Sequence, residues 1–334
     1  MTKNLNICIW WQASEGASGG GNSFLQVLGN ELRTRGITIE NRPSPANDIV
    51  MVSAWNRAPS RFNTPGRVKE AMRRKRASIL GRVLPEFVWG RPNLKQTKRA
   101  KFIHRVDGVA AIYREEGGRA DREQFGINPL CDHTIFQSEY SRECFAEYGL
   151  TPAEWSVVFN GVDTKFFYPI DRDTPNSTLR IASSSWSTNH RKGFADLAKI
   201  ANTPGVELHF FGNWPDEIDS SNVINHGLAN RQKLAEAYRG MDAFAHASLF
   251  ESCSNSLLEG LASGLPTLYV DSGSNKQIVG KHGVELTDDP VTAIEELRDN
   301  YRSVRTSLVE ATESFSISHA ADKYEKIFRQ LAVK

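Results

Sequence analysis

Long apolar runs, cysteine clusters and an excess of charge of either sign are all missing from this chain of 334 residues. No run approaches the ~18 apolar residues of a membrane-spanning helix, and the N-terminus lacks the apolar core of a signal peptide. Four cysteines without metal-ligand spacing or a disulfide framework predict free thiols in a reducing cytoplasm. Lys and Arg number 41 against 39 Asp and Glu, and this balance gives no reason to expect a nucleic acid partner.

What the chain does have is a repeated alternation of short apolar runs with helical patterns. Its length fits two domains of ordinary size. This β-α-β rhythm predicts parallel sheets with helices on both faces, and so two doubly wound α/β domains. The predicted strands are 6–11, 37–40, 48–53, 101–106, 133–138 and 155–161 in the first series, and 179–185, 206–212, 242–248 and 266–270 in the second. The predicted helices are 24–36, 194–201, 233–241 and 256–264.

A polar, proline-containing stretch at 162–178 separates the two series and is the predicted linker. The predicted domains are therefore 1–165 and 166–315, followed by a last helix within 316–334. In doubly wound folds, ligands bind at the carboxyl ends of the strands, and two facing domains enclose a cleft there.

Residues 67–101 carry twelve Lys or Arg against Glu70 and Glu86, with apolar residues at roughly helical spacing. One interpretation is a solvated loop and helix. The other is docking to an anionic membrane surface, where each basic residue contributes roughly 1 kcal/mol. The second interpretation would place a cytoplasmic protein at the inner face of the cell membrane.

The stretch ESCSNSLLEG at 251–260 sets Glu251 and Glu259 on either side of a predicted helix start. Such a start attracts phosphate, and the small side chains of Ser254, Asn255 and Ser256 let one approach the backbone. Glu259 lies about one turn inside, ~6 Å along the axis, and leans back toward the start, where it suits ribose hydroxyls. Glu251 lies beyond the phosphate, where a sugar would sit. The spacing predicts a nucleotide-diphosphate sugar; the alternative is a capped helix with Glu259 on a solvated face.

This stretch resembles the signature of glycosyltransferase family 4, in which two glutamates separated by seven residues precede a Gly-x-Pro, here Gly264-Leu265-Pro266. The similarity runs from about 101 to 290, with Gln277 where a Glu is usual. It implies a retaining transferase of GT-B fold, with two Rossmann-like domains facing across a cleft. The family's last helix commonly crosses back to the first domain.

In the family, a basic pair after the first strand of the second domain holds the donor diphosphate. Lys192 matches the family's lysine and Arg191 adjoins it, whereas the usual Gly-Arg pair is replaced by Ser185 and Trp186. The alternative is an exposed Arg-Lys at a loop end. The Asp-x-Asp at 171–173 has a metal-binding spacing, but it lies in a linker that we expect to be solvated. We therefore expect no metal site and no cofactor, only a UDP- or GDP-sugar donor.

The glycine-rich segment SGGGNSF at 18–24 follows the first predicted strand. The resemblance implies that this loop faces the cleft near the donor phosphates, which suits Gly20 and Gly21. A dinucleotide-binding fingerprint is the rival, because Glu40 ends a strand at the right distance. However, Phe24 stands where its third glycine should be.

His104 and Asp107 are predicted at the carboxyl end of a first-domain strand, projecting into the cleft. The family often has a His or Asp here, and Asp107 is the candidate for orienting the acceptor hydroxyl. The alternative is a packed histidine and an aspartate that caps the next helix.

Together these features predict a metal-independent enzyme that moves a sugar to a glycan or lipid-linked acceptor, as in polysaccharide or glycolipid synthesis. Two alternatives stay open: an epimerase of the same fold, and a catalytically weak binding protein for sugar nucleotides.

Overall fold

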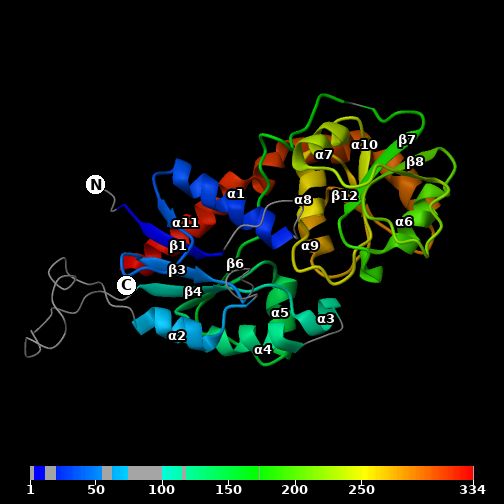
Figure 1. Cartoon of the computed structure of the whole chain (residues 1–334). Coiled ribbons are helices and arrows are strands. Elements are labelled where there is room, and N and C mark those ends of the chain that lie inside the picture. The colour runs from blue at the N-terminus through cyan, green and yellow to red at the C-terminus, as the bar shows by residue number, and fades with distance from the viewer. Residues whose placement is uncertain are drawn as a thin grey trace, which may run out of the picture.

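The computed structural model describes residues 4–11, 20–54, 62–73, 100–114, 118–172 and 174–333. Two α/β domains lie side by side, and each is built on a parallel sheet (Figure 1). Both series of strands predicted from the sequence are confirmed, and β7 and β8 have the predicted bounds.

The first sheet has the order β2-β1-β3-β4-β5-β6, and every pair in it is parallel. Its strands are β1 (Asn6–Trp10), β2 (Thr38–Glu40), β3 (Ile49–Val52), β4 (Lys101–Arg105), β5 (His133–Phe136) and β6 (Trp155–Val157). Its helices are α1 (Gly20–Thr34), α2 (Pro65–Arg73), α3 (Ala110–Arg114), α4 (Gly118–Ile127) and α5 (Glu139–Glu147).

The second sheet has the order β12-β11-β10-β7-β8-β9, and it too is parallel. Its strands are β7 (Leu179–Ser185), β8 (Val206–Gly212), β9 (Val223–Asn225), β10 (Ala243–His246), β11 (Thr267–Tyr269) and β12 (Gly283–Glu285). The helices that follow β7 are α6 (Phe194–Ala201), α7 (Arg231–Tyr238), α8 (Asn255–Ala262), α9 (Asn275–Val279), α10 (Pro290–Glu310) and α11 (Ile317–Val333).

Helix α11 leaves the second domain and packs on the first, alongside α1 (Figure 1). Its buried Tyr324 and Phe328 belong to the same apolar cluster as Leu28 of α1 and Ile7 of β1. The core of the first domain is therefore built from both ends of the described chain.

The chain passes between the domains twice, and the two passages lie against each other. Val162 donates its amide to the Phe315 carbonyl at 2.9 Å and accepts from the Ile317 amide at 2.7 Å. The approach is close enough that a Cβ atom at Gly161 would lie 2.6 Å from the Ser316 carbonyl oxygen. This double passage connects the domains next to the candidate site.

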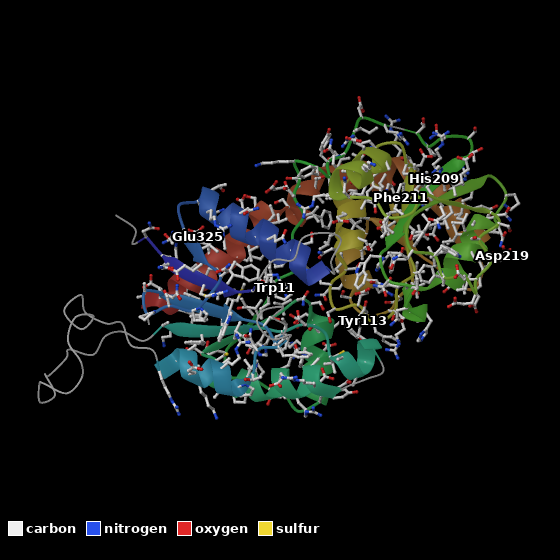
Figure 2. The ribbon with its side chains drawn as sticks, viewed as in Figure 1. Trp11, Tyr113, His209, Phe211, Asp219 and Glu325 are labelled. Atoms are coloured by element: carbon white, nitrogen blue, oxygen red, sulfur yellow. The ribbon has the colours of Figure 1, made fainter. Side chains whose placement is uncertain are left out.

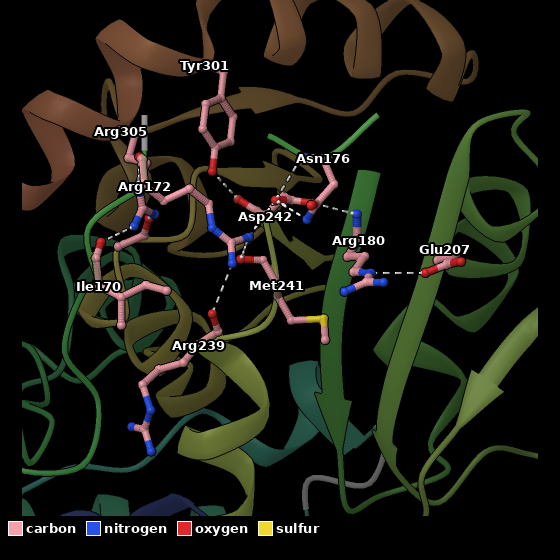
Figure 3. Close-up of polar contacts among 11 residues, drawn as sticks. Ile170, Arg172, Asn176, Arg180, Glu207, Arg239, Met241, Asp242, Tyr301 and Arg305 are labelled. Carbon is pink, nitrogen blue, oxygen red and sulfur yellow. Dashed lines mark hydrogen bonds and ion pairs between the residues drawn. The ribbon is translucent and has the colours of Figure 1, made fainter. Parts of the chain in front are cut away.

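The linker after this passage is fixed to the second domain, which corrects the prediction of a solvated segment. Arg172 contacts the buried Asp242 carboxylate at 2.5 Å (Figure 3). Arg305 of α10, itself buried, donates to the carbonyl of Ile170 at 2.6 Å and to that of Arg172 at 2.8 Å. Asp171 is exposed, while residue 173 lies outside the described ranges.

Within the described ranges, no helix combines the length and the apolar character required to cross a bilayer. Of the basic segment 67–101, the structure describes only the part in α2 and residues 100–101. Its central portion, 74–99, lies outside the described residues, so the two interpretations of this segment stay open.

Candidate active site

Helix α8 begins at Asn255, within a residue of the predicted start, and its start faces the first domain. Ser254 occupies the position before the first turn, yet its hydroxyl caps no helix amide and lies 3.0 Å from the hydroxyl of Ser256. The Asn255 side chain accepts a hydrogen bond from Asn160 of the first domain at 2.8 Å. The helix start therefore carries small polar groups at the boundary between the domains, where backbone amides favour an anion.

Glu251 lies just before α8 and forms an ion pair with Lys192. Both side chains are largely withdrawn from solvent, at 13% and 14% exposure. Lys192 ends a short 3-10 turn, His190–Lys192, at the carboxyl end of β7. The structure thus brings together the two charged residues that the sequence placed 59 positions apart.

Tight backbone contacts hold the loops that carry this pair. Gly193 has a φ of +72°, and a Cβ atom there would lie 2.1 Å from the Ala247 carbonyl oxygen. The Leu249 amide donates to the Arg191 carbonyl at 2.7 Å. Phe250 has a φ of +59°, which is unusual for a residue other than glycine. This residue immediately precedes Glu251, the partner of Lys192.

The electrostatics of the pair keep the lysine charged. Burial alone lowers the pKa of Lys192, but the Glu251 carboxylate and Tyr113 outweigh this effect, so that the pKa is raised above its ordinary value. Tyr113 belongs to α3 of the first domain, and the Lys192 ammonium lies 5.4 Å from the centre of its ring. Figure 2 labels Tyr113 at the edge of the first domain that faces the second.

Glu259 lies one turn inside α8, partly buried in a narrow pocket between the domains. The pocket is lined by Ser23, Phe24, Val27, Gly161, Val162, Asp163, Phe167, Arg231, Asn255 and Glu259. Burial raises the pKa of Glu259 to about 7, although the charge of Arg231 acts in the opposite direction. The carboxyl group therefore changes its charge close to neutral pH.

The glycine-rich segment meets the second domain at the same pocket. Gly20 and Gly21 form the first turn of α1 rather than a loop, and this turn points toward α8 (Figure 1). Two residues further on, the Ser23 hydroxyl accepts a hydrogen bond from Arg231 of α7 at 2.9 Å. Hence α1 begins opposite α8 across the domain boundary.

His104 does not project into the cleft, and this prediction is wrong. His104 lies in β4 with its side chain fully buried, and its Nδ1 atom lies 3.1 Å from the side-chain amide nitrogen of Asn128. Burial lowers the pKa of His104 to about 3, so the ring stays neutral. β4 is an inner strand of a sheet covered on both faces, where either side of the strand is interior. His104 is therefore a packing residue.

Asp107 lies beyond the end of β4, partly exposed, as the sequence predicted. Its carboxylate accepts from the Ser53 hydroxyl at 2.6 Å and lies 3.5 Å from the guanidinium of Arg105. It does not cap the next helix, because Asp121 accepts from the amides of Ala110 and Ala111 at 2.7 and 2.9 Å. The side chain is held in place yet reaches solvent.

Arg191 takes a different place from its neighbour Lys192. Its guanidinium lies 5.0 Å from the centre of the Phe250 ring, and its charge acts on Tyr140 of α5 in the first domain. The structure therefore places Arg191 at the contact between the domains.

Three contributors were missed by the sequence analysis, namely Tyr113, Arg231 and Arg105. Tyr113 and Arg231 lie in helices whose patterns single out neither residue. Arg105 is 1% exposed and donates to Asn160 at 2.6 Å and to Tyr324 of α11 at 3.1 Å. A charged residue inside an apolar strand was the available signal for Arg105, because such a charge needs partners when buried.

Among the residues that the structure describes, no three His, Cys, Asp or Glu side chains gather closely enough to hold a metal ion. The four cysteines are free, and burial raises the pKa of Cys253, next to the site, to about 12. The ionisable groups at the site include Lys192, Glu251, Glu259, Arg231 and Asp107.

Comparison with known proteins places these residues in a recognised domain. Residues 187–302, which include Lys192, Glu251 and Glu259, match the family model described as Glycosyl transferases group 1. A GDP-mannose-dependent alpha-mannosyltransferase of Corynebacterium glutamicum is 23% identical in an alignment 167 residues long, which covers 46% of this chain. The match spans 40% of that relative's length. The glycosyltransferase resemblance is confirmed for this region; membership of family 4 stays a prediction.

Solved structures resemble the whole chain. Sucrose-phosphate synthase from Thermosynechococcus elongatus superposes with a TM-score of 0.67 at 15% identity, covering 98% of this chain and 99% of that one. Anabaena HepE, solved in complex with UDP-glucose, gives a TM-score of 0.64 at 13% identity, covering 98% of this chain and 100% of that one. The chain has the GT-B fold that its sequence predicted.

Proposed function

We propose that this chain is a retaining glycosyltransferase of family 4 that moves a sugar from a nucleotide-diphosphate donor to a hydroxyl group of an acceptor. The observation that carries the proposal is the ion pair between Lys192 and Glu251, held beside the start of α8 where the two domains meet. The pair offers one positive and one negative group at the point where a diphosphate joins its sugar.

Each part of the donor has a matching group. The start of α8, with Ser254, Asn255 and Ser256, faces the diphosphate. Glu259, one turn further in, accepts from the ribose hydroxyls. Glu251 accepts from hydroxyls of the sugar being transferred. The first turn of α1, with Gly20 and Gly21, precedes the pocket residue Ser23, and its lack of side chains lets the backbone approach the donor.

The chemical step depends on stabilising the leaving diphosphate. The bond between the sugar and the phosphate oxygen breaks, and negative charge develops on that oxygen. Lys192 remains protonated beside Glu251, so its ammonium is in place to neutralise this charge. The acceptor hydroxyl, oriented by Asp107, forms the new bond on the face that the phosphate leaves, and its proton passes to the departing phosphate. This route needs no protein nucleophile and gives retention of configuration.

We propose that the reaction needs neither a metal ion nor a cofactor, because Lys192 and the helix start supply positive charge. Arg191 supports this role indirectly by fixing the loop that contains Phe250. For the donor, a GDP-sugar is suggested by the name of the mannosyltransferase relative, and a UDP-sugar by the ligand of the HepE structure. The sugar and the base are to be identified by experiment.

The proposed acceptor is a glycan or a lipid-linked glycan, and the basic segment 67–101 would bring the enzyme to the cytoplasmic face of a membrane. Vesicles of anionic and of neutral lipid test this part alone. Sedimentation with the anionic vesicles at low salt, and release by added salt, would support it. Protein that stays in solution with both would contradict it.

The test of the transferase proposal is a screen of UDP- and GDP-sugars by thermal shift and slow donor hydrolysis, with a chelator present. We expect one donor to stabilise the protein and to be hydrolysed, and Glu251→Ala to abolish the hydrolysis. Glu295→Ala, on the exposed face of α10, is the matched control and should behave as wild type. Binding without any hydrolysis would favour a sugar-nucleotide binding protein. The anomeric configuration of the product, read by NMR, decides retention.

A further inference from the structure

One segment of the first domain, Asp107–Tyr113, closes over the Lys192–Glu251 pair. It contacts the second domain at two points. A Cβ atom at Gly108 would lie 2.9 Å from the hydroxyl oxygen of Ser252, the residue after Glu251. At the end of the segment, the Lys192 ammonium lies over the Tyr113 ring, 5.4 Å from the centre of the ring. Both contacts join residues of different domains, so both depend on how the domains are placed.

The contact with Tyr113 restricts the position of the Lys192 ammonium more than a single ion pair would. A lysine side chain has a flexible four-carbon stem and three N–H donors. Glu251 holds the ammonium from the second domain alone. The face of an aromatic ring attracts a cation, and Tyr113 does so from the opposite domain. The tyrosine also contributes by charge and hydrogen bonding to the raised pKa of Lys192. The ammonium is therefore confined from both domains.

Further contacts join the two domains along the same boundary. The Glu139 amide at the start of α5 donates to the Gln277 side chain of α9 at 3.1 Å. Asn160 of the first domain and Asn255 of the second are joined at 2.8 Å. Opening of the domains would break these connections, and it would withdraw the Tyr113 ring from Lys192.

We propose that Tyr113 is a positioning residue, which fixes Lys192 against Glu251 when the domains close and releases it when they open. The lysine then has its working geometry only in the closed enzyme. The catalytic role of this geometry rests on the proposed function. The coupling between Tyr113 and Lys192 does not depend on that function. A donor would meet a loosely held lysine on entry, and closure would place the charge at the leaving phosphate.

The coupling is tested without any substrate by a double-mutant cycle on thermal unfolding. The variants are Tyr113→Leu, Lys192→Met and the two combined, with Tyr148→Leu as the matched control, since Tyr148 is 50% exposed. Tyr113→Leu should lower the midpoint temperature of unfolding when Lys192 is present, and should change it much less in the Lys192→Met background. Tyr148→Leu should have the same effect in both backgrounds. Additive effects of Tyr113→Leu and Lys192→Met would overturn the proposal.

A kinetic arm uses the donor found in the screen. Tyr113→Leu should lower kcat by about tenfold to a hundredfold, while KM for the donor changes little, because a misplaced group costs rate more than binding. Tyr113→Phe, which keeps the ring but loses the hydroxyl, should recover part of the loss. An unchanged kcat in Tyr113→Leu would overturn the positioning role. If the cycle shows coupling but the wild-type protein turns over no donor, the proposed function fails and the coupling stands.

Discussion

Gly193 and Ala247 are packed so closely that a Cβ atom at position 193 would lie 2.1 Å from the Ala247 carbonyl oxygen. Gly193 also has a φ of +72°, where a side chain is strained. This contact joins the loop of Lys192 to the loop that leads to Glu251. The site therefore depends on a glycine that touches no substrate in the proposed mechanism.

Gly193→Ala should destabilise the protein well beyond the effect of backbone strain alone. Gly36→Ala is the matched control, because Gly36 has a similar φ of +78° and a Cβ atom there would meet nothing within 4 Å. The control should cost about 1–2 kcal/mol, the usual cost of a left-handed residue. Urea unfolding measures both. Equal losses in the two variants would show that the Ala247 contact relaxes without cost.

Lys192→Met should reduce donor turnover by about a hundredfold or more, the loss expected when one preorganised charge at a leaving group is removed. Because the same change leaves Glu251 without its cation, some stability should be lost as well. Lys199→Met is the control, since Lys199 is exposed on α6 and pairs with Asp196 one turn away. Turnover within a factor of two of wild type would remove Lys192 from the mechanism.

The titration of Glu259 should lower the free energy of unfolding as the pH rises from about 4.5 toward 7. The ordinary pKa of a glutamate is 4.5, and burial raises the pKa of Glu259 to about 7 in the folded protein. Between these values the unfolded chain gives up the proton and the folded chain keeps it, so unfolding becomes easier as pH increases. Glu259→Gln should lose this dependence.

The measurement is the difference in unfolding free energy between wild type and Glu259→Gln at pH 5 and at pH 8. The other carboxyl groups cancel in that difference. We expect the variant to gain relative to wild type at the higher pH. A difference that does not change with pH would mean that Glu259 titrates normally.

Arg305→Met should destabilise the second domain by about 3 kcal/mol, because hydrogen bonds from a charged group to buried carbonyls are lost. Two of these carbonyls belong to the linker, at Ile170 and Arg172, and the third is that of Gly264 after α8. Arg302→Met, one turn earlier and exposed, is the control and should be nearly neutral. Unfolding in urea compares them. If both variants were as stable as wild type, the hydrogen bonds from Arg305 would not be needed to hold the linker on the second domain.

The sequence predicted the parts of the fold that repeat and the parts of the site that lie close together in the chain. Strands β7 and β8 are short runs that contain alternating or consecutive apolar residues, and their bounds were predicted correctly. Glu251 and Glu259 belong to one helix start, so their spacing carried the geometry. Lys192 was placed through its resemblance to a family motif rather than through any pattern of its own.

The parts of the site that the sequence did not predict depend on contacts between residues far apart in the chain. His104 was misplaced because an inner parallel strand is covered on both faces, and alternation along it does not tell the cleft from the core. The contact between Tyr113 and Lys192 depends on how two domains close, and the partner of Arg105, Tyr324, lies 219 positions away. No local pattern encodes such pairs.

The packing of α11 on the first domain also has a consequence for biosynthesis. Its residues complete an apolar cluster that includes residues of β1 and α1, near the start of the first domain. During translation those early segments leave the ribosome long before α11 does, at about 5–20 residues per second. The second domain can thus fold while the first still exposes part of its interior. The domain made first is the one finished last, and its unfinished surface is where a chaperone would bind.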